Sequence, residues 1–243
     1  RNPELDSIIQ KKPRIILLNK CDVADSQATT MWLKYFRDKG FYAAAVDCRT
    51  GKGLNSFDSL VKQALKSVIE RNDAKGMSGK PLRLMVVGIP NTGKSSFINR
   101  MGKNAKAKVA DKAGVTRQNQ WFVVGNGIEL LDTPGVLWPK FDDPEVGDKL
   151  AFIGSVKDEV TDKETLACRL LESLAATRPQ AIEDRYKISG ISGLQGWEIL
   201  EMIGKKRGFL IKGGEIDYER AAVIVADEFR GGKLGRITLE LPN

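Results

Sequence analysis

One stretch constrains the fold of this chain more than any other: Gly88-Ile-Pro-Asn-Thr-Gly-Lys-Ser95. It follows the apolar run of residues 82–87 and precedes a segment, residues 94–101, that has the pattern of a helix. A glycine-containing turn GxxxxGK[ST] between a strand and a helix lets backbone N–H groups and the helix N-terminus surround phosphate oxygens. The stretch therefore predicts an α/β domain with a phosphate-binding loop, in preference to a chance glycine turn.

Two further residue groups are typical of phosphate and Mg²⁺ binding. The Lys94 ammonium is expected to reach the β- and γ-phosphates, and the Ser95 hydroxyl is expected to bind Mg²⁺. In Asp132-Thr-Pro-Gly135 the carboxylate can hold Mg²⁺ through water and the Gly135 N–H can meet the γ-phosphate, although alone the segment is an ordinary Pro-Gly turn. The candidate phosphate-binding residues are Asn91, Thr92, Gly93, Lys94, Ser95, Ser96 and Gly135.

Asn19-Lys20-Cys21-Asp22 fits the pattern NKxD, which indicates a guanine-selecting site. The Asp22 carboxylate can accept from both N1–H and the 2-amino group of guanine, whereas adenine offers neither donor. Because an unpaired buried carboxylate is costly, the discrimination against adenine is expected to be large. Lys20 can lay its methylenes along the base while Asn19 braces the site. A polar strand end is the alternative interpretation of these four residues.

The guanine motif precedes the phosphate loop, the reverse of the common order. Ligands of open α/β sheets bind at the carboxyl ends of the strands, and each motif here follows a predicted strand. Permuting the connections leaves those ends in place. The predicted strands are residues 14–18, 41–46 and 82–87, with a hairpin of 120–125 and 128–131 around Asn126-Gly127; the predicted helices between them are residues 2–12, 26–39, 55–71 and 94–101.

The pattern changes after about residue 143. Helical spacing then dominates, and a short strand is predicted at residues 236–241. We therefore predict a doubly wound α/β domain, residues 1–143, followed by a small and mainly helical domain, residues 144–243. The helices predicted in the second domain are residues 162–176, 179–187, 195–207 and 217–230.

The net charge of +8 is concentrated in the first domain. Basic clusters of this kind suit contact with RNA, although a solvated basic face is an equally good interpretation. No apolar run reaches the roughly 20 residues that span a bilayer, and three scattered cysteines suit a reducing cytoplasm. The candidate RNA contacts are Lys103, Lys106, Lys108, Lys205, Lys206 and Arg207.

In motif order the chain resembles the circularly permuted GTPases, in particular the ribosome biogenesis GTPase A group. The resemblance rests on Asn19–Asp22, Gly88–Ser95, Gly114-Val-Thr116-Arg and Asp132–Gly135, and it covers nearly the whole chain. It implies GTP and GDP as ligands and late assembly of the large ribosomal subunit or its precursor, with rRNA as a partner. It also implies that Thr116, on the first switch loop, joins Ser95 and Asp132 around Mg²⁺.

The chain departs from the family pattern in its base-flanking loop and its catalytic groups. Asp47-Cys48 replaces the usual Ser-Ala, but the Cys48 N–H can still meet guanine O6, whereas the Asp47 carboxylate has no evident role. Val136 stands where many GTPases have a water-orienting glutamine. The phosphate loop also resembles those of potassium-activated GTPases, so Asn91 is a candidate K⁺ ligand.

The family's histidine is missing, since the chain contains none, and the first domain has fewer strands than the family's sheet. We therefore expect an N-terminal segment upstream of Arg1, assign no catalytic base, and predict slow turnover that the ribosomal particle stimulates. Two alternatives stay open: a guanine-nucleotide-gated RNA-binding module with little hydrolysis, and a GTPase of another RNA-maturation pathway.

Overall fold

The computed structural model describes residues 8–9, 12–102, 119–135, 137, 143–156 and 162–242. The chain divides into two compact units, Arg1–Pro139 with Glu240–Asn243, and Lys140–Leu239. All strands of the described residues lie in the first unit and the second is helical, which confirms the predicted α/β class. The helix predicted at residues 2–12 falls mostly outside these residues, but Ile8 and Ile9 are helical.

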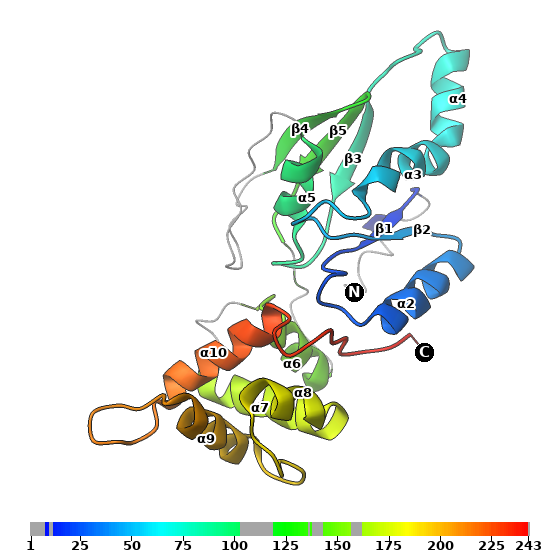
Figure 1. Ribbon diagram of the computed structural model, residues 1–243. Helices are drawn as coiled ribbons and strands as arrows, with labels where there is room; N and C mark the ends of the chain where they lie inside the picture. Colours follow the sequence, from blue (N-terminus) through cyan, green and yellow to red (C-terminus); the bar gives the residue numbers. More distant parts are fainter. Residues whose placement is uncertain are drawn as a thin grey trace. The chain divides into compact units, whose positions relative to one another are not determined.

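The first unit begins with a parallel strand pair. β1 (Ile15–Leu18) pairs with β2 (Tyr42–Ala45), and α2 (Ser26–Asp38) connects them. Asp25 caps α2 by accepting hydrogen bonds from two backbone N–H groups of its first turn, each at 2.9 Å. Figure 1 shows α2 and α3 (Phe57–Ala64) on opposite sides of this pair, as the doubly wound prediction requires.

The single helix predicted at residues 55–71 is wrong, because three shorter elements replace it. η1 (Leu54–Ser56) leads into α3, and α4 (Lys66–Ala74) follows after Leu65. Leu65 has φ −107° and ψ 15°, which ends the helical path. Phe57 and Val61 of α3 are buried, whereas α4 has no buried residue, so no core contact keeps α4 in line with α3.

A second strand group carries the phosphate loop. β3 (Leu82–Val86) pairs in parallel with β5 (Ile128–Asp132), and β4 (Gln120–Gly125) pairs antiparallel on the far side of β5. The predicted hairpin is confirmed: Asn126 (φ 51°) and Gly127 (φ 72°) both have the left-handed conformation that a tight turn of this kind needs. α5 (Lys94–Met101) packs on β4 and β5.

Both strand groups share one apolar core. Phe57 of α3 and Phe97 of α5 meet edge to face with ring centroids 5.0 Å apart. Val46, after β2, and Leu130, in the middle of β5, belong to the same buried cluster. This core holds the carboxyl ends of β1, β2, β3 and β5 within one unit, and those ends carry the motifs.

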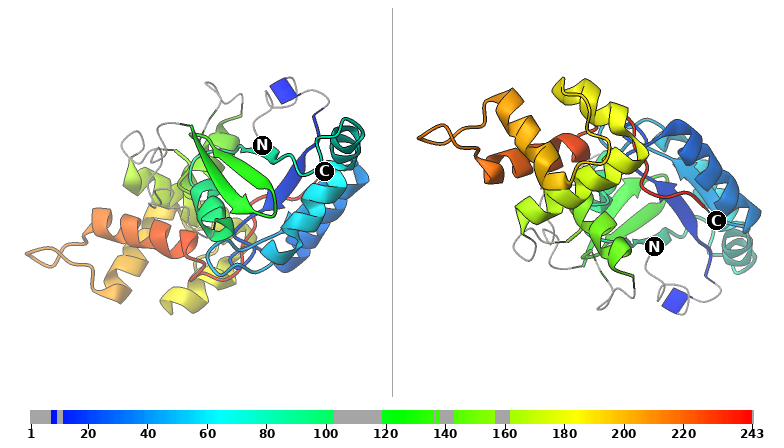
Figure 2. Two further views of the ribbon diagram at one scale, coloured as in Figure 1. Left: turned by 90° about the horizontal axis from the view of Figure 1, so that it is seen from above. Right: turned by 90° about the horizontal axis from the view of Figure 1, so that it is seen from below.

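The second unit is built from five helices among the described residues: α6 (Pro144–Phe152), α7 (Lys163–Thr177), α8 (Pro179–Tyr186), α9 (Gly196–Arg207) and α10 (Tyr218–Arg230). α7 lies at the centre, with Leu170 and Leu171 fully buried. The sequence prediction missed α6, although Asp143 caps it and Pro144 occupies its first turn, a typical helix start. The loop between α9 and α10 projects from the helices in all views (Figures 1 and 2).

The strand predicted at residues 236–241 is wrong. The segment is irregular, with bends at Arg236 and Leu239, and pairs with no strand of the described residues. Ile237 and Leu239 pack on the helical core instead. The tail from Glu240 belongs to the first unit, where the Trp32 indole N–H of α2 donates to the Glu240 carbonyl at 3.1 Å. Alternating apolar residues here serve side-chain packing rather than a sheet ladder.

Candidate nucleotide site at the strand ends

Strand register brings the predicted motifs to common edges. Val86 lies opposite Asp132 in the parallel β3–β5 pair, so the phosphate loop and Asp132-Thr-Pro-Gly135 leave the sheet side by side. Leu18 lies opposite Ala45 in the β1–β2 pair, so Asn19 and the segment containing Cys48 also emerge together. These are carboxyl ends, where open α/β sheets bind their ligands.

The phosphate loop turns sharply between β3 and α5. Gly93 has φ 88° at the start of α5, and Asn91 has φ 58°, a left-handed conformation that asparagine tolerates better than most residues. The Lys94 ammonium donates to the carbonyls of Gly88 and Ile89 at 3.1 and 2.9 Å, which folds its side chain over the loop. Burial lowers the pKa of Lys94, while the nearby Asp132 carboxylate acts in the opposite direction.

Asp132 ends β5 as a carboxylate that is only 2% exposed. Its Oδ2 accepts from the Ser95 hydroxyl at 2.9 Å, and its Oδ1 is buried without a hydrogen-bond partner among the residues that the structure describes. A buried carboxylate oxygen beside a hydroxyl fits a hard cation that prefers oxygen ligands, so these residues fit Mg²⁺. Gly135 packs so tightly that a Cβ there would lie 2.7 Å from the Pro90 Cα.

Asn19 joins the two halves of the site across 73 positions of sequence. Its Nδ2 donates to the Thr92 carbonyl of the phosphate loop at 2.8 Å, and its Oδ1 accepts from the Cys48 N–H at 3.0 Å. A Cβ at Gly93 would lie 2.3 Å from the Asn19 Nδ2, so only glycine allows this contact. Base motif, base-flanking loop and phosphate loop are therefore connected through one amide side chain.

Asp47 has the structural role that the sequence did not reveal. Its buried carboxylate accepts from the Arg49 N–H at 2.8 Å and from the Thr50 hydroxyl, which closes a tight turn. Burial alone would raise the pKa of Asp47, but these hydrogen bonds lower it below its ordinary value. Burial also raises the pKa of the Cys48 thiol to about 12, so the thiol stays neutral near pH 7.

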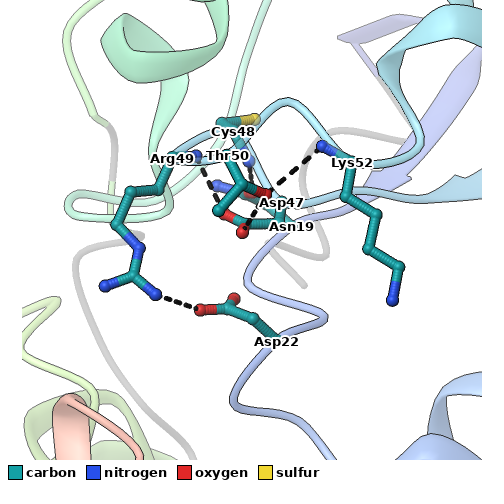
Figure 3. A network of polar contacts seen from close by, with 7 residues as sticks. All are labelled: Asn19, Asp22, Asp47, Cys48, Arg49, Thr50 and Lys52. Carbon is teal, nitrogen blue, oxygen red and sulfur yellow. Dashed lines mark hydrogen bonds and ion pairs between the residues drawn. The ribbon is translucent and has the colours of Figure 1, made fainter.

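Asp22 follows at the edge of this network, and its side chain is 26% exposed. Its Oδ2 accepts from Nη2 of Arg49 at 3.1 Å (Figure 3). Lys20, next to Asp22 in the motif, has φ 60°, an uncommon conformation for a side chain of this length and one that recurs at functional sites.

The structure brings together most of the residues predicted to bind nucleotide. Thr116, Val136, Lys103, Lys106 and Lys108 lie outside the described residues.

Sequence reasoning missed two arginines. Arg49 contacts Asp22, and Arg100 of α5 donates to the Thr50 carbonyl. Arg49 directly follows Cys48, so its place in the base-flanking loop was a signal that could have been followed. Arg100 had no comparable signal, because its contact joins residues 50 positions apart.

A strand–glycine loop–helix carrying lysine and serine, linked to an NKxD motif from an earlier strand, defines a P-loop nucleotide-binding protein with permuted motif order. The sequence model of a family described as "50S ribosome-binding GTPase" matches residues 83–186. Ribosome biogenesis GTPase A of Priestia megaterium is 44% identical, over 100% of this chain and 84% of that protein. Its namesake from Thermotoga maritima is 32% identical, over 96% of this chain and 78% of that protein.

Two solved structures are similar to this chain in both fold and sequence. GDP-bound YlqF is 31% identical with a TM-score of 0.63 over 94% of this chain and 83% of that chain. GNP-bound YlqF from T. maritima is 30% identical with the same score, over 94% and 82% of the two chains. The chain belongs to the ribosome biogenesis GTPase A family, and its enzymatic activity is that of a GTPase.

Proposed function

We propose that this GTPase is a switch that acts late in assembly of the large ribosomal subunit or its precursor. The observation that carries the proposal is the Asn19–Thr92 hydrogen bond of 2.8 Å. Because this bond connects the guanine motif with the phosphate loop, both can bind one nucleotide. The ribosomal partner is supported by the family description, which names 50S binding, and by relatives named for ribosome biogenesis.

Guanine recognition falls to the strand ends of β1 and β2. In the proposed complex Asp22 accepts from N1–H and the 2-amino group, Lys20 lies along the base, and Asn19 braces the site through its bond to the Thr92 carbonyl. The Cys48 N–H, which donates to Asn19 Oδ1 at 3.0 Å, exchanges that acceptor for guanine O6. A backbone donor suits this role because the neutral Cys48 side chain need not take part.

Phosphate binding falls to the loop and the start of α5. Backbone N–H groups of residues 91–96 surround the phosphates, Lys94 leaves its carbonyl partners to meet the β- and γ-phosphates, and the Gly135 N–H meets the γ-phosphate. Ser95, Thr116 and, through water, Asp132 would hold Mg²⁺, which neutralises charge on the phosphate oxygens. No residue is assigned as general base, since Val136 has no polar atom on its side chain and the chain has no histidine.

We propose that K⁺ supports hydrolysis through Asn91. Hydrolysis is expected to be at least about fivefold faster in KCl than in NaCl, which corresponds to about 1 kcal/mol of transition-state stabilisation. Asn91→Gly should abolish the difference, because glycine removes the amide ligand while tolerating the φ of 58°. The measurement is steady-state phosphate release at equal ionic strength. Equal wild-type rates in both salts would contradict the proposal.

Of the three basic residues at the end of α9 that the sequence predicts to contact RNA, two take part in ion pairs within the protein. Lys205 pairs with Glu201 at 2.5 Å, and Arg207 lies 3.7 Å from the buried Glu228 and over the Tyr186 ring. Glu228 also forms an ion pair with Arg185, so Arg207 belongs to a structural cluster of ion pairs. We propose Lys206 as the main phosphate contact of the three.

The loop that follows α9 carries exposed apolar side chains. Leu210 and Ile211, which follow α9, are 49% and 47% exposed. We propose that this loop joins Lys206 in contacting the ribosomal particle. The three free cysteines suit the cytoplasmic location that the proposal implies. No helix among the described residues is both long and apolar enough to cross a membrane.

Purified large subunits are expected to raise the GTP turnover of this protein at least about tenfold, because a partner must supply what Val136 cannot. Multiple-turnover hydrolysis in KCl would be compared with and without large subunits, with small subunits as the matched control. If large subunits gave no stimulation while GTP binding persisted, the proposed partner would be wrong and another RNA-maturation pathway would be favoured.

A further inference from the structure

The guanine-selecting carboxylate already has a cationic partner. Nη2 of Arg49 lies 3.1 Å from Oδ2 of Asp22 (Figure 3). The Arg49 side chain is 80% exposed, whereas that of Asp22 is 26% exposed. An ion pair with one partner this exposed is weak, so the guanidinium can leave the carboxylate at little cost.

The backbone that carries Arg49 is held much more firmly than its side chain. The Asp47 carboxylate, on a residue 3% exposed, accepts from the Arg49 N–H at 2.8 Å, and the Asp47 N–H donates to the Lys52 carbonyl at 2.9 Å. Thr50, which follows Arg49, is also held, because the Arg100 guanidinium of α5 donates to its carbonyl. A fixed backbone keeps the guanidinium within reach of Asp22 even when the pair is open.

The chemistry of the two ligands of Asp22 is closely matched. The edge of guanine that carries N1–H and the 2-amino group is itself a guanidine fragment, with its N–H donors in one plane. Arginine presents the same planar donors, which suit a carboxylate. Guanine, which would use both carboxylate oxygens, therefore competes with Arg49 for Oδ2 of Asp22.

We propose that Arg49 is an affinity-determining residue of the guanine site, because its guanidinium competes with guanine for Asp22. The inference rests on the guanine site of the proposed function. Binding a nucleotide must first break the Arg49–Asp22 pair, and re-forming the pair assists release. Arg49 thereby lowers guanine-nucleotide affinity and favours exchange of GDP for GTP.

Lys52 provides a matched control. It lies on the same loop and carries the same charge, but its ammonium lies to one side of Asp22, and no contact is drawn between the two (Figure 3). Arg49→Ala and Lys52→Ala thus each remove one positive charge from this loop, and only Arg49→Ala removes the ion pair with Asp22. Both side chains are exposed, so both variants are expected to unfold at the wild-type temperature.

The test is equilibrium binding of a ribose-labelled fluorescent GDP to the whole protein. Arg49→Ala is expected to bind about two- to fivefold more tightly than Lys52→Ala, the range that an exposed ion pair allows. The ratio should fall toward one as ionic strength rises, because salt screens an exposed pair. Equal or weaker binding by Arg49→Ala would overturn the proposal, and weaker binding would indicate that Arg49 covers the base.

A double-mutant cycle separates this inference from the guanine site on which it rests. In an Asp22→Asn background, Arg49→Ala should affect labelled XDP binding no more than Lys52→Ala does, because the ion pair is gone. If Asp22→Asn left GDP binding intact, the guanine site itself would be wrong. If Asp22→Asn lost GDP but Arg49→Ala gave no tightening in the wild-type background, only the competition would be wrong.

Discussion

Replacing Asp22 by asparagine is expected to weaken GTP binding at least about a thousandfold and to create a preference for XTP. Guanine offers two donors to the carboxylate, whereas an amide has only one acceptor oxygen. The amide N–H₂ would therefore face one of the guanine donors, and two donors cannot form a hydrogen bond. That leaves a partly buried donor unpaired on each side. Xanthine carries a carbonyl at C2 in place of the amino group, so it can accept from the new amide.

Competition binding with GTP, XTP and ATP would measure this change. Asp38→Asn is the matched control, since Asp38 is an exposed residue at the end of α2 and pairs with Lys34 outside the site. Its affinities should equal those of the wild type. The assignment of Asp22 fails if Asp22→Asn keeps wild-type GTP affinity, or if GTP and XTP affinities fall together.

Replacing Lys94 by alanine is expected to lower GTP hydrolysis by about 10²–10³-fold and to weaken GTP binding as well. Lys94 is part-buried, and its ammonium sits on carbonyls 3.1 and 2.9 Å away within the phosphate loop. A desolvated cation interacts strongly with phosphate charge because little water screens it. Its loss also leaves the 2%-exposed Asp132 without its nearby positive charge.

Single-turnover hydrolysis at saturating GTP would separate the chemical defect from the binding defect. Lys80→Ala, just before β3 and exposed, controls for loss of one charge. Thermal unfolding without nucleotide should show that the Lys94→Ala protein is folded. Wild-type hydrolysis by that folded variant would contradict the phosphate role of Lys94.

The confirmed parts of the fold are those with local causes. The hairpin turn needs only Asn126 and Gly127, because both adopt positive φ readily. The phosphate loop likewise depends on a glycine at φ 88° between an apolar strand and a helix, a pattern visible within a few residues. The failed predictions, the single helix over residues 55–71 and the strand over residues 236–241, both depended on what lies against the segment.

The sequence by itself determined the class of fold, the motif order and the residue types that we propose to meet guanine, phosphate and Mg²⁺. Those signals are short and are tied to backbone conformation. Only the tertiary structure decided that Asn19 bridges to Thr92, that Arg49 pairs with Asp22 and that Arg207 turns to Glu228. Such pairs join side chains of distant segments, and a linear pattern carries no distance between them.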